Sequence, residues 1–99
     1  MNITEEKNGS VLTVKPEGRL DTLSSRDLEN FLNSRYGEAT RVIFDFEKVI
    51  YISSAGLRVL IQAFNAMKEK DGIVLRNVCP QVMEVLTLSG YIHVLNIEE

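Results

Sequence analysis

The sequence predicts a single α/β domain over residues 1–99, with a mixed β-sheet of four to five strands and three to four α-helices packed on it. Short β-branched and apolar runs alternate with segments whose apolar residues recur at helical spacing. An Asn-Gly pair between the first two runs is typical of an antiparallel hairpin, whereas strands that alternate with helices favour right-handed parallel crossovers. With 44% hydrophobic and 25% charged residues, a chain of 99 residues suits one hydrophobic core and is too short for two.

The chain is expected to open with a hairpin and a turn. Two strands, over residues 3–7 and 11–14, flank the pair Asn8-Gly9, which suits the positive φ angles of a tight turn. Residues 18–22 are then predicted to form a turn that leads away from the second strand. These features place the first two strands side by side and antiparallel.

A helix and a buried strand are expected next. The helix covers about residues 25–36, and either Ser24 or Ser25 is suited to cap it. Its apolar positions fall on one face and are Leu28, Phe31 and Leu32. The following run, residues 41–46, is nearly continuous in apolar and β-branched residues. Such a run is typical of a central strand that is covered on both faces.

The next part of the chain combines an extended segment with the clearest helix. Residues 49–52 form a short extended apolar segment, and residues 53–56 then open a helix. The apolar positions of this helix recur at helical spacing and are Leu57, Leu60, Ile61, Phe64 and Met67. The change from an extended run to a helical period predicts a strand end followed directly by a helix start.

The C-terminal part is expected to add a strand, a helix and a last strand. Residues 73–75 are a short buried strand, and a helix begins at Pro80, where proline is tolerated in the first turn. The apolar face of that helix is formed by Val82, Val85 and Leu86. Gly90 is expected to end it, and residues 91–97 are expected to form the last strand.

Composition and charge exclude several classes of function. The net charge of −3 leaves no basic surplus for contacts with a phosphate backbone, so direct nucleic-acid binding is not expected. One cysteine, Cys79, cannot form an internal disulfide framework or a cysteine-rich zinc site. No apolar run approaches the ~20 residues that span a bilayer, and residues 1–7 carry no signal-peptide core. We therefore expect a cytoplasmic protein without membrane insertion.

Two loops are expected to meet at the carboxyl edge of the sheet, where sites of α/β proteins tend to form. They are residues 18–22 and residues 51–56. The second loop opens a helix, so its unpaired N–H groups and the helix dipole favour a bound anion or a phosphoserine. The other interpretation is purely structural, because Ser53 or Ser54 is also suited to be a simple N-cap.

The segment 51–60, with the sequence YISSAGLRVL, resembles the signature of STAS domains. In that signature a strand end, a serine, a small residue, a glycine and a leucine open a regulated helix. Residues 18–21 are similar to the Gly-x-Leu-Asp turn of the family, and residues 42–46 are similar to the strand before its signature. Further matches occur downstream at residues 75–78 and at Val82, Leu86 and Gly90. The resemblance covers essentially the whole chain and points to the anti-sigma-factor antagonists.

The resemblance implies a partner-switching function. The unphosphorylated form binds a partner that is both an anti-sigma factor and a serine kinase of the histidine-kinase-like ATPase type, and this binding frees the sigma factor. Phosphorylation breaks the complex, and a serine phosphatase resets it. We expect ATP to be bound by the partner, so no cofactor is expected in this chain. The sequence also indicates no metal site and no catalytic residue.

The resemblance also implies which residues act. The phosphoacceptor is the serine before the small residue and the glycine, which is Ser54. Ser53 stands where the family often has Asp, so the acceptor's neighbour lacks a negative charge and Ser53 is the second choice as acceptor. The residues expected to contact the partner are Asp21, Ser53, Ser54, Ala55, Gly56 and Arg58.

Two other functions stay open from the sequence. A constitutive STAS subunit could support a membrane transport complex without being phosphorylated. A small enzyme could use Asp21 and Ser54, although no residue is placed as its general base. The remaining candidate residues have simpler structural interpretations, and they are Asp45, Arg58, Cys79 and His93.

Overall fold

The computed structural model describes residues 1–98, and Glu99, the end of the acidic tail, lies outside them. Its strands are β1 (Asn2–Asn8), β2 (Val11–Leu20), β3 (Arg41–Asp45), β4 (Val49–Ile52), β5 (Ile73–Arg76) and β6 (Ile97–Glu98). Its α-helices are α1 (Thr22–Asn33), α2 (Ser54–Met67) and α3 (Pro80–Leu88), and two 3-10 turns cover Tyr36–Glu38 and Tyr91–His93. The predicted mixed α/β fold is confirmed, and the described sheet has six strands.

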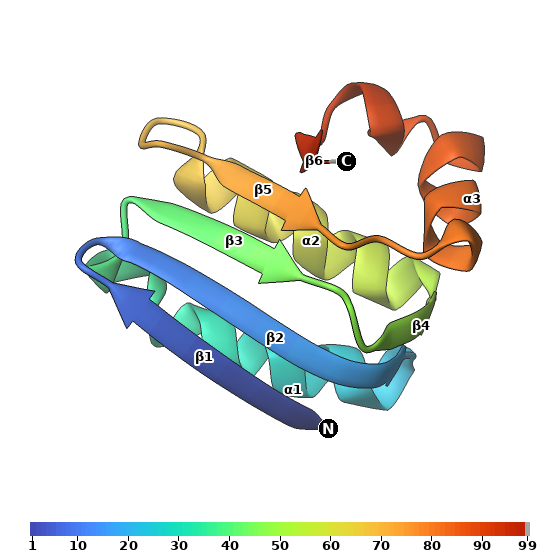
Figure 1. Ribbon diagram of the computed structural model, residues 1–99, viewed down its shortest axis with the longest axis horizontal. Coiled ribbons are helices and arrows are strands. Elements are labelled where there is room, and N and C mark those ends of the chain that lie inside the picture. The colour runs from blue at the N-terminus through green and yellow to red at the C-terminus, as the bar shows by residue number, and fades with distance from the viewer. Residues whose placement is uncertain (99) are drawn as a thin grey trace.

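The sheet is antiparallel only at its first pair (Figure 1). Strand β1 pairs antiparallel with β2 through the predicted Asn-Gly turn, where Gly9 has a φ of +64°. The remaining pairs are parallel and give the order β1-β2-β3-β5-β6, while β4 lies off this path and pairs with the last residues of β2. The sheet exceeds the expected four to five strands because β4 and the two-residue β6 both join it.

The core lies between one face of the sheet and helices α1 and α2, which both pass behind the sheet in Figure 1. Strand β3 shows the consequence, because Val42 and Phe44 are fully buried while the alternate residues Ile43 and Asp45 are only half-buried. The prediction that this strand is covered on both faces was therefore wrong. The run is nearly continuous in apolar residues because alternate side chains are buried, while Ile43, on the open face of the sheet, is also apolar.

Strand β2 is longer than the sequence indicated. It continues through residues 18–20, which were predicted as part of a turn, because those residues pair with β4. The register shifts between Gly18 and Arg19, and Gly18 has a φ of +100°, a conformation that glycine adopts readily. Helix α1 accordingly begins at Thr22 and ends at Asn33, earlier at both ends than expected.

The segment 91–97 is mostly not a strand, in contrast to the prediction. Gly90 ends α3 with a φ of +82°, and the chain then forms a 3-10 turn in which the Leu95 N–H donates to the Tyr91 carbonyl at 2.9 Å. This turn buries Leu95, which is 5% exposed. Only Ile97–Glu98 pairs with β5, as the two-residue strand β6.

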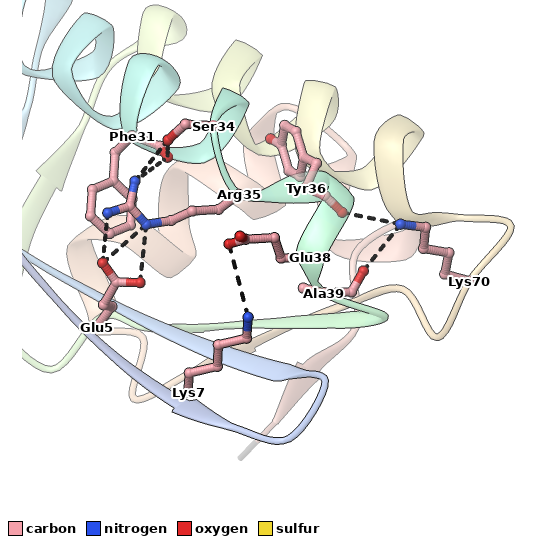
Figure 2. A network of polar contacts seen from close by, with 9 residues as sticks. All are labelled: Glu5, Lys7, Phe31, Ser34, Arg35, Tyr36, Glu38, Ala39 and Lys70. Atoms are coloured by element: carbon pink, nitrogen blue, oxygen red, sulfur yellow. Dashed lines mark hydrogen bonds and ion pairs between the residues drawn. The ribbon is translucent and has the colours of Figure 1, made fainter.

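A polar network fastens β1 to the C-terminal end of α1 (Figure 2). The Arg35 guanidinium donates from Nη2 to Glu5 Oε2 at 2.7 Å and from Nη1 to the Phe31 carbonyl at 2.9 Å, and it stacks 3.6 Å from the Phe31 ring centre. The hydrogen bond from Arg35 lowers the pKa of Glu5 below its ordinary value. This network holds the edge strand against the helix layer.

Arg35→Met is expected to lower the free energy of unfolding by about 1–2 kcal/mol, because it removes the ion pair and the stacking on Phe31. Since the folded pKa of Glu5 lies below the unfolded one, the ion pair stabilises fully above the ordinary value of 4.5 and is lost as the pH falls through the folded pKa. Urea unfolding of wild type and variant as a function of pH measures both effects.

The matched control is Lys7→Met, because Lys7 pairs with Glu38 at 3.9 Å, the upper limit of an ion pair. This control is expected to cost less than about 0.5 kcal/mol. Equal losses in the two variants would contradict a special role for Arg35.

Candidate functional site

The first half of the site is the junction between β2 and α1. Asp21 is the N-cap of α1, and its Oδ1 accepts a hydrogen bond from the Ser24 N–H at 3.0 Å. The Ser24 hydroxyl in turn accepts from the Asp21 N–H at 2.9 Å, which completes a capping box. The expectation that Ser24 or Ser25 is the cap was wrong, because Ser24 occupies the reciprocal position of the box. The bonds from Ser24 lower the pKa of Asp21, so its exposed carboxylate is ionised at neutral pH.

The second half is the junction between β4 and α2. Ser53 is the N-cap of α2, and its half-buried hydroxyl accepts from the Gly56 N–H at 3.3 Å. Ser54 is the first residue of the helix, and its side chain is exposed. Within residues 1–98, the Ser54 hydroxyl makes no hydrogen bond, in contrast to that of Ser53. The two adjacent serines therefore have different positions: one caps the helix and the other faces solvent.

Backbone pairing brings the two junctions together. Leu20 and Ile52 are register partners at the ends of β2 and β4, and the Ser53 N–H donates to the Leu20 carbonyl at 2.8 Å. Asp21 and Ser53 follow these paired residues directly. The prediction that the loops after these strands lie at one edge of the sheet is therefore confirmed.

Gly56 allows this close approach. A Cβ placed on Gly56 would lie 2.7 Å from Ile52 Cγ1 and 3.2 Å from the Leu20 carbonyl oxygen. Glycine is thus required where the first turn of α2 crosses the ends of β2 and β4. Gly56 is buried, so it allows the two junctions to pack closely and offers little surface to a partner.

An exposed apolar rim next to these junctions was missed by the sequence analysis. Leu23 in the first turn of α1 is 74% exposed, and Ile50 and Tyr51 in β4 are 59% and 36% exposed. The Arg19 guanidinium lies 4.3 Å from the centre of the Tyr51 ring. All four residues of β4 are apolar, and alternation along a strand would expose only one of Ile50 and Tyr51, so no clear signal in the sequence indicated that both are exposed.

The other candidate residues lie in structural roles. Asp45 Oδ1 accepts from the Glu47 N–H at 3.1 Å and from Asn77 Nδ2 at 3.0 Å, so it stabilises the turn after β3. The Cys79 thiol is half-buried and donates to a carbonyl in β4, and His93 is exposed in the second 3-10 turn. Within residues 1–98, no group of three His, Cys, Asp or Glu side chains is arranged to hold a metal ion. In that same part of the chain, no helix has the length and hydropathy to cross a membrane.

The sequence model of the STAS domain matches residues 2–99. The chain belongs to the STAS domain family. It is also 30% identical, over 95% of its length and 83% of the relative, to BtrV of Bordetella bronchiseptica, which is named as an anti-sigma factor antagonist. This relationship places it in the anti-sigma-factor antagonist branch of the STAS proteins.

Solved structures agree on the fold. The unphosphorylated form of SpoIIAA, an anti-sigma factor antagonist, superposes with a TM-score of 0.84 at 18% identity, over 99% of this chain and 89% of that one. The phosphorylated form of SpoIIAA from Bacillus gives a TM-score of 0.76 at 18% identity, over 99% and 92% of the two chains. At this identity the likeness concerns the fold, and the STAS signature of this chain maps onto the start of α2.

Ser53→Ala is expected to lower the free energy of unfolding of this STAS domain by about 1 kcal/mol, because the cap of α2 is lost. Ser53→Asp should restore stability to within about 0.5 kcal/mol, since aspartate is an equally good cap. Ser54→Ala is the matched control and should change stability by less than about 0.5 kcal/mol. Urea denaturation of the three variants measures these differences, and a larger loss for Ser54→Ala than for Ser53→Ala would reverse the assignment of the cap.

Gly56→Ala is expected to cost about 1–3 kcal/mol, because the added methyl group overlaps the side chain of Ile52 and the backbone of Leu20. Gly37→Ala is its control, since a Cβ there meets no atom within 4 Å and stability should be unchanged or slightly raised. Thermal unfolding of both variants tests whether the loss of stability comes from the close packing at Gly56 and not from the replacement of a glycine as such.

Proposed function

We propose that this STAS protein is an anti-sigma-factor antagonist that acts by partner switching, with Ser54 as the phosphorylated residue. In its unphosphorylated form it binds a protein that is both an anti-sigma factor and a serine kinase, and so releases the sigma factor. The observation that carries the proposal is the exposed, unbonded hydroxyl of Ser54 at the first position of α2. The kinase supplies the catalytic groups, and this chain supplies the acceptor.

The chemistry favours Ser54 over Ser53 as the acceptor. The γ-phosphoryl group of ATP is transferred to Ser54 Oγ, the hydroxyl proton leaves to a base of the kinase, and ADP is released. Ser54 Oγ can approach the nucleotide without losing a bond. Ser53 Oγ would lose its role as cap of α2, and its side chain is half-buried.

A charge change at this position is sufficient for switching. A phosphoserine carries about −1.5 to −2 charges at neutral pH and adds them next to the ionised Asp21 at the same edge of the sheet. The modified serine lies at the N-terminus of α2, where negative charge is favourable for the helix, so the backbone need not change. The effect falls on the partner, because like charges brought together in an interface cost several kcal/mol.

The exposed apolar rim can supply binding energy for the complex. Leu23, Ile50 and Tyr51 come from two elements that flank the start of α2, and all three side chains are accessible. Tyrosine is among the residue types that contribute most to affinity at the centre of an interface, so Tyr51 is the main anchor of the three. A partner that covers Ser54 would bury them in the same contact, so phosphorylation would act at the centre of the interface.

The relatives support this reading. BtrV is named as an anti-sigma factor antagonist, and SpoIIAA, which shares the fold, exists in phosphorylated and unphosphorylated forms. The same fold in both forms of SpoIIAA is consistent with a switch that works by local charge.

Incubation with ATP and the kinase-like anti-sigma factors of the same cell is expected to place one phosphate on Ser54, identified by fragment mass spectrometry. Ser54→Ala should abolish the phosphate and retain partner binding, whereas Ser54→Asp should weaken binding about 100-fold or more, because each ~1.4 kcal/mol of repulsion is tenfold in affinity. Calorimetric titration measures the affinities.

Ser10→Asp is the control, since Ser10 lies in the β1–β2 turn at the other end of β2 and the same charge there should leave binding unchanged. Phosphate on Ser53 would keep the switch and correct the residue. Binding without phosphate from any candidate kinase would instead indicate a constitutive STAS subunit.

A further inference from the structure

A groove runs between α1 and α2 beside the proposed phosphoacceptor. It encloses about 160 Å³, and its lining includes Thr22, Ser25, Arg26, Glu29, Ala55 and Arg58. Ala55 follows Ser54 directly, and Arg58 lies one turn further along α2. The groove therefore begins at Ala55, the residue after the one that the proposed function modifies.

The groove has two arginines without ion-pair partners. Arg26 and Arg58 are both exposed, and none of the ion pairs found within residues 1–98 includes either of them. Two other arginines do have such partners, because Arg35 pairs with Glu5 and Arg76 pairs with Glu98. In a chain of net charge −3, two unpaired guanidinium groups across one groove form a local site for an anion.

Ser25 is the second, independent feature of the groove. Its side chain is 2% exposed, and its hydroxyl is a buried polar group without a hydrogen-bond partner in the described part of the chain. A buried hydroxyl in this state is destabilising until a ligand or a water satisfies it. Ser25 lines the groove, but its hydroxyl oxygen has almost no accessible surface, so an anion would accept its hydrogen bond only after a small shift of the side chain.

We propose that the groove holds the phosphate of phosphorylated Ser54 of the same chain, with Arg58 and Arg26 as its cationic ligands and Ser25 as a hydroxyl donor. The inference rests on the proposed function, since it needs a phosphate on Ser54. Ser54 and Arg58 are four residues apart on α2, the spacing at which helical side chains are neighbours. The positive end of the α2 dipole lies next to Ser54 and adds to the attraction for the phosphate.

The carboxylate of Glu29 makes one end of the groove less favourable for an anion than the other. Glu29 lies one helical turn beyond Arg26, away from the start of α1, and it is the acidic side chain of the lining. Its charge repels an anion from that end and favours the end formed by Arg58 and the start of α2. A phosphate that is already attached to Ser54 satisfies this arrangement without leaving its own helix.

Capture of the phosphate would change the surface in two ways at once. The unmodified protein presents two free guanidinium groups to a partner, whereas the modified protein uses them internally. Phosphorylation would then add a negative charge and also withdraw two positive ones from the contact surface. This predicts that acidic groups of the partner lie opposite the groove in the complex.

The test uses protein with phosphoserine incorporated at position 54 during translation, so no kinase is needed. A ³¹P NMR titration gives the second pKa of the phosphate, which is about 6 for an exposed phosphoserine. The wild-type value should lie below this reference, and Arg58→Gln and Arg26→Gln should each raise it by about half a unit or more. Ser25→Ala should raise it by less, since it removes a donor but no charge.

Arg41→Gln is the matched control, because Arg41 is an exposed arginine at the start of β3 and outside the groove. It should leave the pKa unchanged. An equal pKa in wild type, Arg26→Gln and Arg58→Gln would overturn the proposal. A pKa that depends on protein concentration would also overturn it, since the phosphate would then bind a second molecule.

A second arm separates the attached phosphate from free anions. Inorganic phosphate is titrated into unmodified protein while the backbone amide resonances of Ala55 and Arg58 are followed. Saturable shifts there, combined with an Arg-independent pKa in the phosphoserine protein, would reassign the groove to free phosphate and reject capture in the same chain. Failure of the kinase to modify Ser54 is a separate result, because the phosphoserine protein is made without it.

Discussion

The parallel pairing between the last residues of β2 and β4 is the constraint on which the site depends. The Ser53 N–H donates to the Leu20 carbonyl, and Leu20 pairs in register with Ile52, so the starts of α1 and α2 must lie side by side. Gly56 makes this approach possible, because any larger residue would meet both strand ends. The apolar rim, the two helix caps and the groove between the helices all follow from this crossing. Residues far apart in the sequence thus form one surface through the pairing of two strands.

The regular elements with strong local signals were predictable, and those that depend on pairing were not. The helical spacing after Gly56 and the Pro80 start predicted α2 and α3, and Asn8-Gly9 predicted the hairpin. The extension of β2 past Gly18 was missed because glycine in a short polar run favours a turn, and only the distant partner β4 makes it extended. The C-terminal 3-10 turn was missed for a similar reason, since the burial of Leu95 outweighs local β propensity.

The candidate site divides in the same way. The position of Ser54 could be predicted, because an extended run followed by a helical period places the serines at a helix start. Which serine is the cap depends on backbone dihedral angles, and these assign Ser53 a φ of −94° and a ψ of 176°, outside the helix. The arginine groove could not be predicted at all, because Arg26 and Arg58 are brought together only by the packing of α1 on α2. Pairwise contacts between helices leave no signature in a single sequence.

The division of roles between the two serines explains how a stable domain can carry a switch. Ser53 caps the start of α2, so the proposed phosphorylation of Ser54 would not uncap the helix. In the proposed phosphorylated form, the helix dipole and the arginines of the groove would offset the added charge inside the protein. In the proposed switch, the cost of phosphorylation would fall mainly on the complex, where a partner that buries Leu23 and Tyr51 would also have to accept a dianion. A domain that is stable in both states, with an interface that tolerates only one, needs no change of fold to act as a switch.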